Sequence, residues 1–169
     1  MAPDRLLSAV RSLRRPRTAS IEVDAPPAAV MALVGDPIAM ARFGEEIHRV
    51  RLLGGATAAT VGTRFAGSNH HRLRRWTTIC TVTDAAETRF GFEVHAPRPL
   101  GVHISRWQFD VEALDEGQRT RLTQTNWIKV PWWFFPAAVI ITGTVNRPDA
   151  NQQHIETTLE RVKAEVESP

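Results

Sequence analysis

The chain has 169 residues, of which 43% are hydrophobic, 23% are charged and one is a cysteine. This composition is typical of a soluble globular protein, so it excludes a disordered chain, a collagen-like repeat and a scaffold held by internal disulfides. The formal net charge is +3, but residues 1–17 hold five Arg and one Asp, which leaves a net charge of −1 on the rest. That balance argues against a nucleic-acid-binding domain, because such a domain needs a basic face on its folded part.

Residues 1–18 are expected to form a basic N-terminal extension. Within it, residues 4–15 carry four apolar side chains at helical spacing, with most arginines on the other side. The four are Leu6, Leu7, Val10 and Leu13. A short basic amphipathic helix of this kind lies on anionic membrane surfaces, and the alternative is a solvated, partly ordered extension. Because no continuous apolar run has the length of a membrane span, we expect a cytoplasmic protein, either free or peripheral to a membrane.

A strand and two short helices are expected to follow the extension. Residues 20–24 alternate polar and apolar side chains, which predicts a strand. Pro26 and Pro27 end this strand, because proline cannot donate to a β-ladder, and Pro27 suits the first turn of a helix over 28–34. A turn at Gly35-Asp36-Pro37 then leads into a second short helix over 37–43.

Six further strands are predicted where period-two alternation runs between turn signals. They span 47–53, 62–68, 76–82, 89–95, 103–113 and 118–129. The short links between them favour an antiparallel meander over parallel crossovers.

The C-terminal part is predicted to be helical. Ile155, Leu159, Val162 and Val166 recur at spacings of four, three and four, so this apolar stripe should pack on the sheet. The preceding segment 132–142 is apolar nearly all round, which is typical of a buried helix or of a segment that covers the core.

The order of these elements resembles the helix-grip fold, and the local sequences are similar to the SRPBCC superfamily. That superfamily includes START-like, polyketide cyclase/dehydrase and Bet v 1-like proteins. The resemblance is carried by SIEVDAPPAAV (20–30), LGGAT (53–57), VGTRF (61–65), WTTICTV (76–82), TRLT (120–123) and TLERVK (158–163). It covers about residues 19–167 and implies one α+β domain. A seven-stranded curved antiparallel sheet would wrap around a long C-terminal helix, with two short helices after the first strand.

The resemblance also implies a cavity between the curved sheet and the helix. The alternation along the strands predicts which side chains form the wall of this cavity. They are mostly aromatic and aliphatic, with a few neutral polar groups, and such a wall suits an apolar ligand with one polar group. The predicted ligand-binding residues are Trp76, Thr78, Cys80, Phe90, Phe92, Val94, Trp107, Phe109, Leu122, Gln124, Asn126, Trp132 and Trp133. The alternative is that these side chains fill the core completely.

Trp132 and Trp133 belong to a run of four aromatic residues, 132–135, which cannot all point inward. One hypothesis is a lid or membrane-touching lip at the cavity mouth, because Trp favours the membrane interface. The alternative is an aromatic cap over the core, buried by a dimer partner.

The six histidines lack the spacing of metal ligands, so no metal and no cofactor are expected. His70 and His71 are adjacent and would point to opposite faces of a strand. His95 and His103 flank a loop and are the candidate proton-transfer groups near the rim of the pocket. The chain contains no Tyr, which weakens any cyclase mechanism that needs a phenol.

The sequence therefore predicts a protein that binds or carries a hydrophobic small molecule, either a lipid or a polyketide-like compound, as a monomer or homodimer. The first alternative is an aromatase, cyclase or dehydratase that uses the same pocket with His95 or His103. The second is an accessory or regulatory domain whose pocket is vestigial. No nucleic-acid partner is expected.

Overall fold

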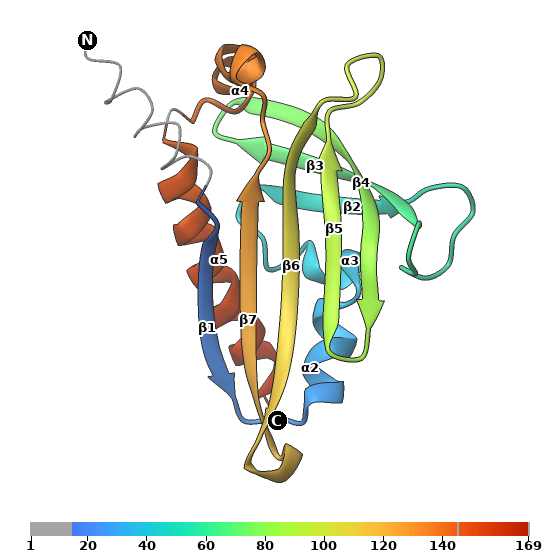
Figure 1. The fold of residues 1–169 in the computed structure, drawn as a ribbon, viewed down its shortest axis with the longest axis vertical. Helices are drawn as coiled ribbons and strands as arrows, with labels where there is room; N and C mark the ends of the chain where they lie inside the picture. The colour runs from blue at the N-terminus through green and yellow to red at the C-terminus, as the bar shows by residue number, and fades with distance from the viewer. Residues whose placement is uncertain (1–14, 145, 169) are drawn as a thin grey trace.

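The computed structural model describes residues 15–144 and 146–168, so nearly all of the predicted amphipathic segment 4–15 lies outside it. Figure 1 shows the fold. The helices and strands are β1 Arg17–Val23, α2 Pro27–Val34, α3 Pro37–Met40, β2 Ile47–Leu52, β3 Arg64–His71, β4 Arg74–Ala86, β5 Arg89–His95, β6 His103–Leu114, β7 Arg119–Ile128, α4 Phe135–Thr142 and α5 Arg147–Val166. Two 3-10 turns, η1 Asp115–Gly117 and η2 Trp132–Phe134, complete the order.

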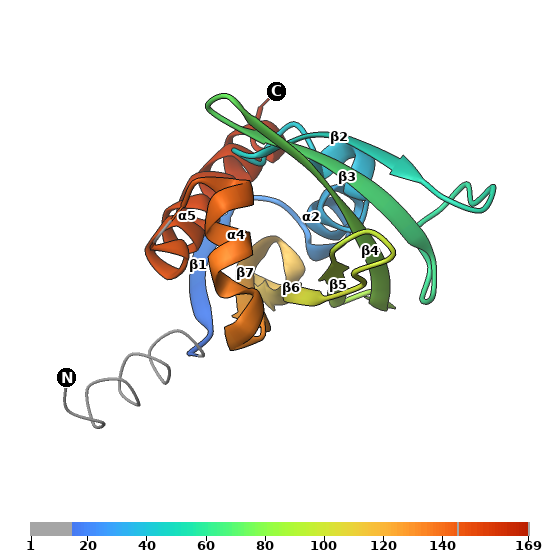
Figure 2. The same ribbon diagram turned by 90° about the horizontal axis from the view of Figure 1, so that it is seen from above.

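The seven strands form one antiparallel sheet in the order β1-β7-β6-β5-β4-β3-β2. The sheet curves around α5, and α2 and α3 lie inside its bend, as the two views in Figures 1 and 2 show. The predicted α+β helix-grip architecture is confirmed. None of the helices in residues 15–144 and 146–168 is long and apolar enough to cross a membrane.

Local chemistry fixes the first helices. Pro27 occupies the first turn of α2, where its missing N–H costs nothing. The Asp36 carboxylate caps α3 by accepting a hydrogen bond from the Ile38 backbone N–H at 2.8 Å. The predicted helix over 37–43 is too long, because α3 ends at Met40 and tighter turns continue the chain, with the Phe43 N–H donating to the Met40 carbonyl.

The β3–β4 hairpin is longer than predicted. β3 continues to His71 and β4 begins at Arg74, so only Arg72 and Leu73 form the turn. Arg72 adopts a positive φ of 55°, the left-handed conformation that a two-residue hairpin turn requires.

One end of the molecule has a fully packed core; we call it the closed end, where the turns 24–26, 87–88 and 115–118 lie (Figure 1, bottom). There α2 and α5 both pack on the sheet. The buried side chains that fill this end include Val23, Val30, Val82, Val111, Leu122, Ile155, Leu159 and Val162. The opposite end, which we call the open end, consists of residues 70–75, 96–102 and 129–144 (Figure 1, top).

Candidate ligand-binding cavity

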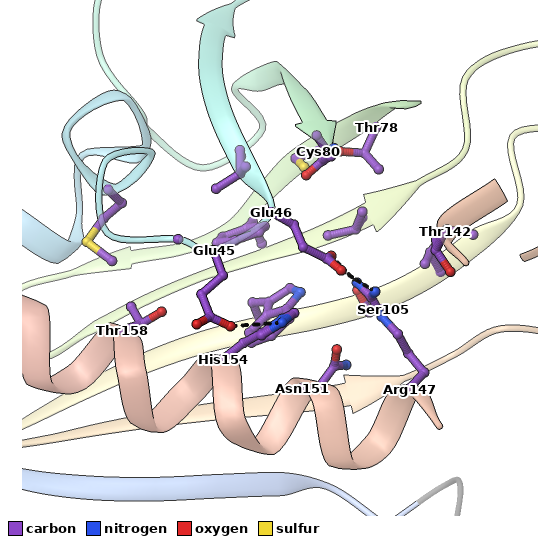
Figure 3. Close-up of a pocket in the computed structure, with 18 of the residues that line it drawn as sticks. Glu45, Glu46, Thr78, Cys80, Ser105, Thr142, Arg147, Asn151, His154 and Thr158 are labelled. Carbon is purple, nitrogen blue, oxygen red and sulfur yellow. Dashed lines mark hydrogen bonds and ion pairs between the residues drawn. The ribbon is translucent and has the colours of Figure 1, made fainter. Parts of the chain in front are cut away.

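A cavity of about 230 Å³ lies between the sheet and α3, α4 and α5, on the side of the core that faces the open end (Figure 3). One buried water needs only about 15 Å³, so this space is far larger than a packing defect. Strands β2 to β7 contribute most of its walls, and the rest comes from the helices α2 to α5 and from neighbouring loops, chiefly residues 41–46. The expected hollow between sheet and helix is therefore present.

Nine of the thirteen residues predicted to bind a ligand line this cavity. They are Trp76, Thr78, Cys80, Phe90, Phe92, Val94, Trp107, Phe109 and Gln124. They come from β4, β5, β6 and β7 at alternate positions, because alternate side chains of a strand share one face of the sheet. Ligand binding by these residues stays a prediction.

The other four predicted residues lie elsewhere. Leu122 is fully buried in the closed end, where it pairs with Val111 across β6 and β7. Asn126 is also fully buried but is covered by α5: its Nδ2 donates to the Arg106 carbonyl at 3.1 Å, and its Oδ1 accepts from Asn151 Nδ2 at 2.6 Å. Asn126 therefore positions Asn151, which does line the cavity.

Trp132 and Trp133 point into solvent, with 82% and 57% of their surface exposed. Their neighbour Phe134 is buried and Phe135 lines the cavity, so the aromatic run turns two side chains inward and two outward. The two tryptophans lie beside the cavity rather than in its wall, and no part of the described chain buries them.

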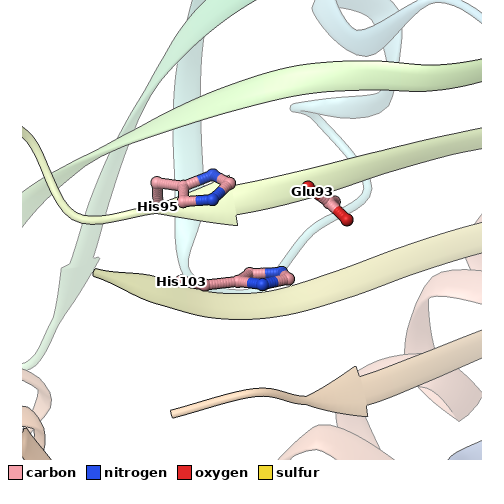
Figure 4. Close-up of side chains that lie close together, drawn as sticks. All are labelled: Glu93, His95 and His103. Carbon is pink, nitrogen blue, oxygen red and sulfur yellow. The ribbon is translucent and has the colours of Figure 1, made fainter. Parts of the chain in front are cut away.

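His95 and His103 do come together, as expected for residues that flank one loop. Their rings stack with centroids 4.7 Å apart (Figure 4), but neither residue lines the cavity. Glu93 lies beside them, on the face of β5 opposite Phe92 and Val94. The predicted proton-transfer role of the two histidines within the pocket thus has no support from their position.

Glu93, His95 and His103 together form a set of metal-ligand types that the histidine spacing alone did not reveal. One donor atom from each lies within 4.8 Å of the others, and His103 Nε2 is buried without a hydrogen-bond partner among the described residues. Two imidazoles and a carboxylate suit a divalent transition metal. Burial lowers the pKa of His95, and the neighbouring His103 lowers it further, which favours the neutral imidazole that such ions bind.

The polar cavity residues that sequence reasoning missed include four titratable side chains: Glu45, Glu46, Arg147 and His154. The Arg147 guanidinium donates to both Glu46 carboxylate oxygens, at 2.7 and 2.6 Å, in a bidentate pair that links α5 to the start of β2. The His154 Nε2 lies 3.0 Å from Glu45 Oε2 (Figure 3). Burial is the main cause that lowers the pKa of His154, which favours the neutral imidazole beside the Glu45 carboxylate.

A sequence signal for the helical part of this set exists. Arg147, Asn151, His154 and Thr158 recur at spacings of four, three and four, and all four line the cavity. They form a second face of α5, beside the apolar stripe that packs on the sheet. A polar face at helical spacing is usually solvated, which is why the pattern did not indicate a site.

Two buried carbonyl oxygens in the cavity wall lack a hydrogen-bond donor among the described residues. They belong to Gln124, on β7, and Asn151, on α5, whose side chains are 5% and 3% exposed. A buried acceptor without a partner costs about 1–3 kcal/mol. The pair can therefore accept hydrogen bonds from a hydroxyl or an N–H group of a bound molecule.

Cys80 is not suited to nucleophilic chemistry. Burial raises the pKa of its thiol to about 12, and only a side-chain hydrogen bond with Thr78 opposes this effect. Because the thiolate is the reactive form, Cys80 contributes apolar surface to the cavity wall.

Residues 17–167 match the model of a protein family described as polyketide cyclase/dehydrase and lipid transport. The chain belongs to this family. No curated protein matches the chain. Its membership accounts for the sequence motifs and for the fold, and places it within the SRPBCC superfamily.

Solved structures show the same fold at low identity. A hypothetical protein from Helicobacter pylori superposes with a TM-score of 0.68 at 13% identity, covering 98% of this chain and 95% of that one. A polyketide cyclase-like protein from Corynebacterium glutamicum gives 0.58 at 24% identity, with coverage of 90% and 93%. The di-domain ARO/CYC protein of the steffimycin biosynthetic pathway gives 0.62 at 12% identity, covering 89% of this chain and 44% of that one. These similarities concern the fold alone.

Proposed function

We propose that the protein binds a hydrophobic small molecule, a lipid or polyketide-like compound, in the cavity beneath the open end. The observation that carries this proposal is the hollow itself, walled by aromatic and aliphatic side chains. Transfer of the ligand's apolar surface from water supplies most of the affinity, at roughly 25 cal/mol per Å². Membership of a family described by cyclisation, dehydration and lipid transport supports a ligand of this chemistry.

The polar groups of the wall favour a ligand with a hydrogen-bond donor and no negative charge. Glu46 and Arg147 neutralise each other, so this pair leaves no charge for a ligand to balance. The free acceptors of Gln124 and Asn151 call for a hydroxyl or N–H group instead. A volume of about 230 Å³ lies just below the roughly 300–1,000 Å³ of typical ligand pockets, which favours a compact molecule.

Native mass spectrometry of gently purified protein, followed by solvent extraction, tests the proposal directly. We expect a mass excess that disappears on denaturation and an apolar compound in the extract. Ala138→Phe places a ring in the cavity wall and should abolish this retention, whereas Ala137→Phe, one position along α4 and outside the wall, should preserve it. Equal retention by both variants, or none by the natural sequence, would contradict the proposal; the latter result favours a vestigial pocket.

An enzyme of the aromatase, cyclase or dehydratase type is the second candidate, supported by the His154–Glu45 pair in the cavity wall. A neutral imidazole beside a carboxylate is the arrangement of a general base, because the carboxylate stabilises the imidazolium that forms when the ring accepts a proton. Incubation of the extracted compound with stoichiometric protein distinguishes the two functions. Conversion that is lost in His154→Gln favours the enzyme, and full recovery of the unchanged compound favours the carrier.

A further inference from the structure

The open end exposes an unusual concentration of large apolar side chains. Of the eight such side chains exposed in the described part of the chain, six lie there: Leu73, Leu100, Trp132, Trp133, Ile140 and Ile141. Leu73, at the tip of the β3–β4 turn, is completely exposed. Single exposed apolar residues are common, but six at one end of a small domain mark an interaction surface.

These side chains belong to three chain segments that lie at the same end of the fold (Figures 1 and 2). The β3–β4 hairpin is joined to α4, because His71 Nδ1 lies 3.1 Å from the Thr142 carbonyl oxygen. Gly143 ends α4 with a φ of 71°, and a Cβ there would lie only 2.9 Å from Arg74 Nε, so Arg74 packs directly on this turn. The Lys129 N–H donates to the Ile104 carbonyl at 2.8 Å, which fixes the start of segment 129–144 beside the β5–β6 loop.

The charge of the open end has one sign. Residues 70–75, 96–102 and 129–144 contain five Lys or Arg and no Asp or Glu. The five are Arg72, Arg74, Arg75, Arg98 and Lys129, all exposed. The turns of the closed end, 24–26, 87–88 and 115–118, contain four acidic residues and no Lys or Arg. Asp24 and Asp115 of these turns are paired with Arg119 at the start of β7, whereas the five cations of the open end have no acidic residue within its three segments.

We propose that the open end docks on an anionic lipid membrane, with its apolar side chains at the interface and its cations against the head groups. Trp favours the depth where lipid tails meet head groups, and each Lys or Arg near an anionic surface improves partitioning about fivefold. The acidic turns of the closed end point away from the membrane in this orientation. Phe135, Ala138 and Val139 of α4 line the cavity, so docking brings the cavity wall to a source of apolar molecules.

A second copy of the chain is a poor occupant of the same surface. A twofold dimer would place the open end of one copy against the open end of the other. The five cations of one copy would then face the five cations of its partner, with no acidic residue between them. The basic residues 1–17 are mismatched for the same reason, because they carry a net charge of +4. An anionic bilayer complements both the charge and the apolar tips.

Co-sedimentation of the full chain with vesicles tests the docking surface. We expect binding to vesicles of phosphatidylcholine mixed with phosphatidylglycerol, little binding to phosphatidylcholine alone, and weakening at high salt. Trp132→Ser with Trp133→Ser should lower partitioning at least about tenfold. The triple variant R75Q/R98Q/K129Q should lower it about 100-fold.

Matched variants elsewhere on the surface serve as controls. R49Q/R51Q/R64Q removes three exposed arginines from β2 and β3, and I38S/V61S removes two exposed apolar residues outside the open end. Both controls should bind within about twofold of the natural sequence, since neither touches the proposed surface. Equal losses in test and control variants would overturn the proposal.

Three other results would also overturn it: no vesicle binding by the full chain, binding abolished by L6S/L7S but kept by the tryptophan variant, or a dimer in solution that the tryptophan variant dissolves. The docking surface does not depend on an occupied cavity. Ligand retention measured without vesicles therefore tests ligand binding alone, and vesicle binding tests membrane docking alone, so a failure of one proposal is distinguished from a failure of the other.

Discussion

The same strands close one end of this molecule and leave the other hollow. Near the closed end Val111 and Leu122 pair across β6 and β7 and meet α2 and α5, so no space remains. A few residues along the same strands, Phe109 pairs with Gln124 and both border the cavity. The difference lies in the second layer: α2 packs on the sheet mainly at the closed end and borders the cavity only with Val34, while α4 and the polar face of α5 leave space in front of the aromatic wall. Large side chains thus do not fill a core unless a second layer meets them.

The largest effect should come from equal truncations at the two ends. Leu159→Ala removes a fully packed side chain of the closed end and should lower the free energy of unfolding by about 3 kcal/mol. Ile104→Ala removes as many atoms from the cavity wall, where one side is already empty, and should cost only about 1 kcal/mol. Urea denaturation measures both. Equal losses would mean that the two ends are equally well packed.

The bidentate pair at the cavity should matter more than a surface pair of the same chemistry. Glu46→Gln leaves the largely buried Arg147 without its counter-charge, and we expect a loss of about 2 kcal/mol in unfolding free energy. Glu165→Gln breaks the exposed pair with Arg42 and should cost less than about 0.5 kcal/mol. A double-mutant cycle with Arg147→Gln isolates the interaction; a coupling energy near zero would show that the pair does not stabilise the cavity.

Acid should weaken the fold slightly through His154. Because burial lowers the pKa of His154 in the folded protein, the unfolded chain binds its proton first as the pH falls below the ordinary histidine value of 6.5. This contribution to stability is complete above that pH and is lost as the pH falls toward the folded-state pKa. Melting temperatures across this range should decline less steeply in His154→Gln, while exposed His48→Gln should follow the natural sequence.

Local patterns were sufficient to predict the strands, the C-terminal helix and the part of the cavity wall that β4, β5, β6 and β7 provide at alternate positions. Alternation along β4 and β5 assigns Trp76, Cys80 and Phe92 to one face because each strand is regular there. The family resemblance added what no local pattern carries, namely that the sheet curves and encloses a space.

The misplaced histidine shows where alternation fails. Counting back from Trp107 in steps of two assigns His103 to the cavity face. The strands slip at this point, since Val94 pairs with Ser105 while His95 pairs with His103, which leaves Ile104 as an extra residue. The bulge turns His103 to the opposite face, beside Glu93. Such a slip depends on pairing between strands and leaves no local sequence pattern.

The polar cavity residues could not be predicted for a different reason. Glu45 and Glu46 lie in a loop before β2, and only the folded chain brings them to Arg147 and His154, about a hundred residues later. Their charges are typical of a solvated surface. Tertiary placement alone makes them part of the wall.

The first and last strands of the sheet order, β1 and β2, are not hydrogen-bonded to each other. A closed barrel can widen only by breaking ladder bonds, whereas here the two margins can separate with every ladder intact. The Glu46–Arg147 and Glu45–His154 pairs instead join the segment before β2 to α5 across this gap. The width of the interior on this side is therefore set by side-chain contacts and not by the hydrogen-bond ladder of the sheet.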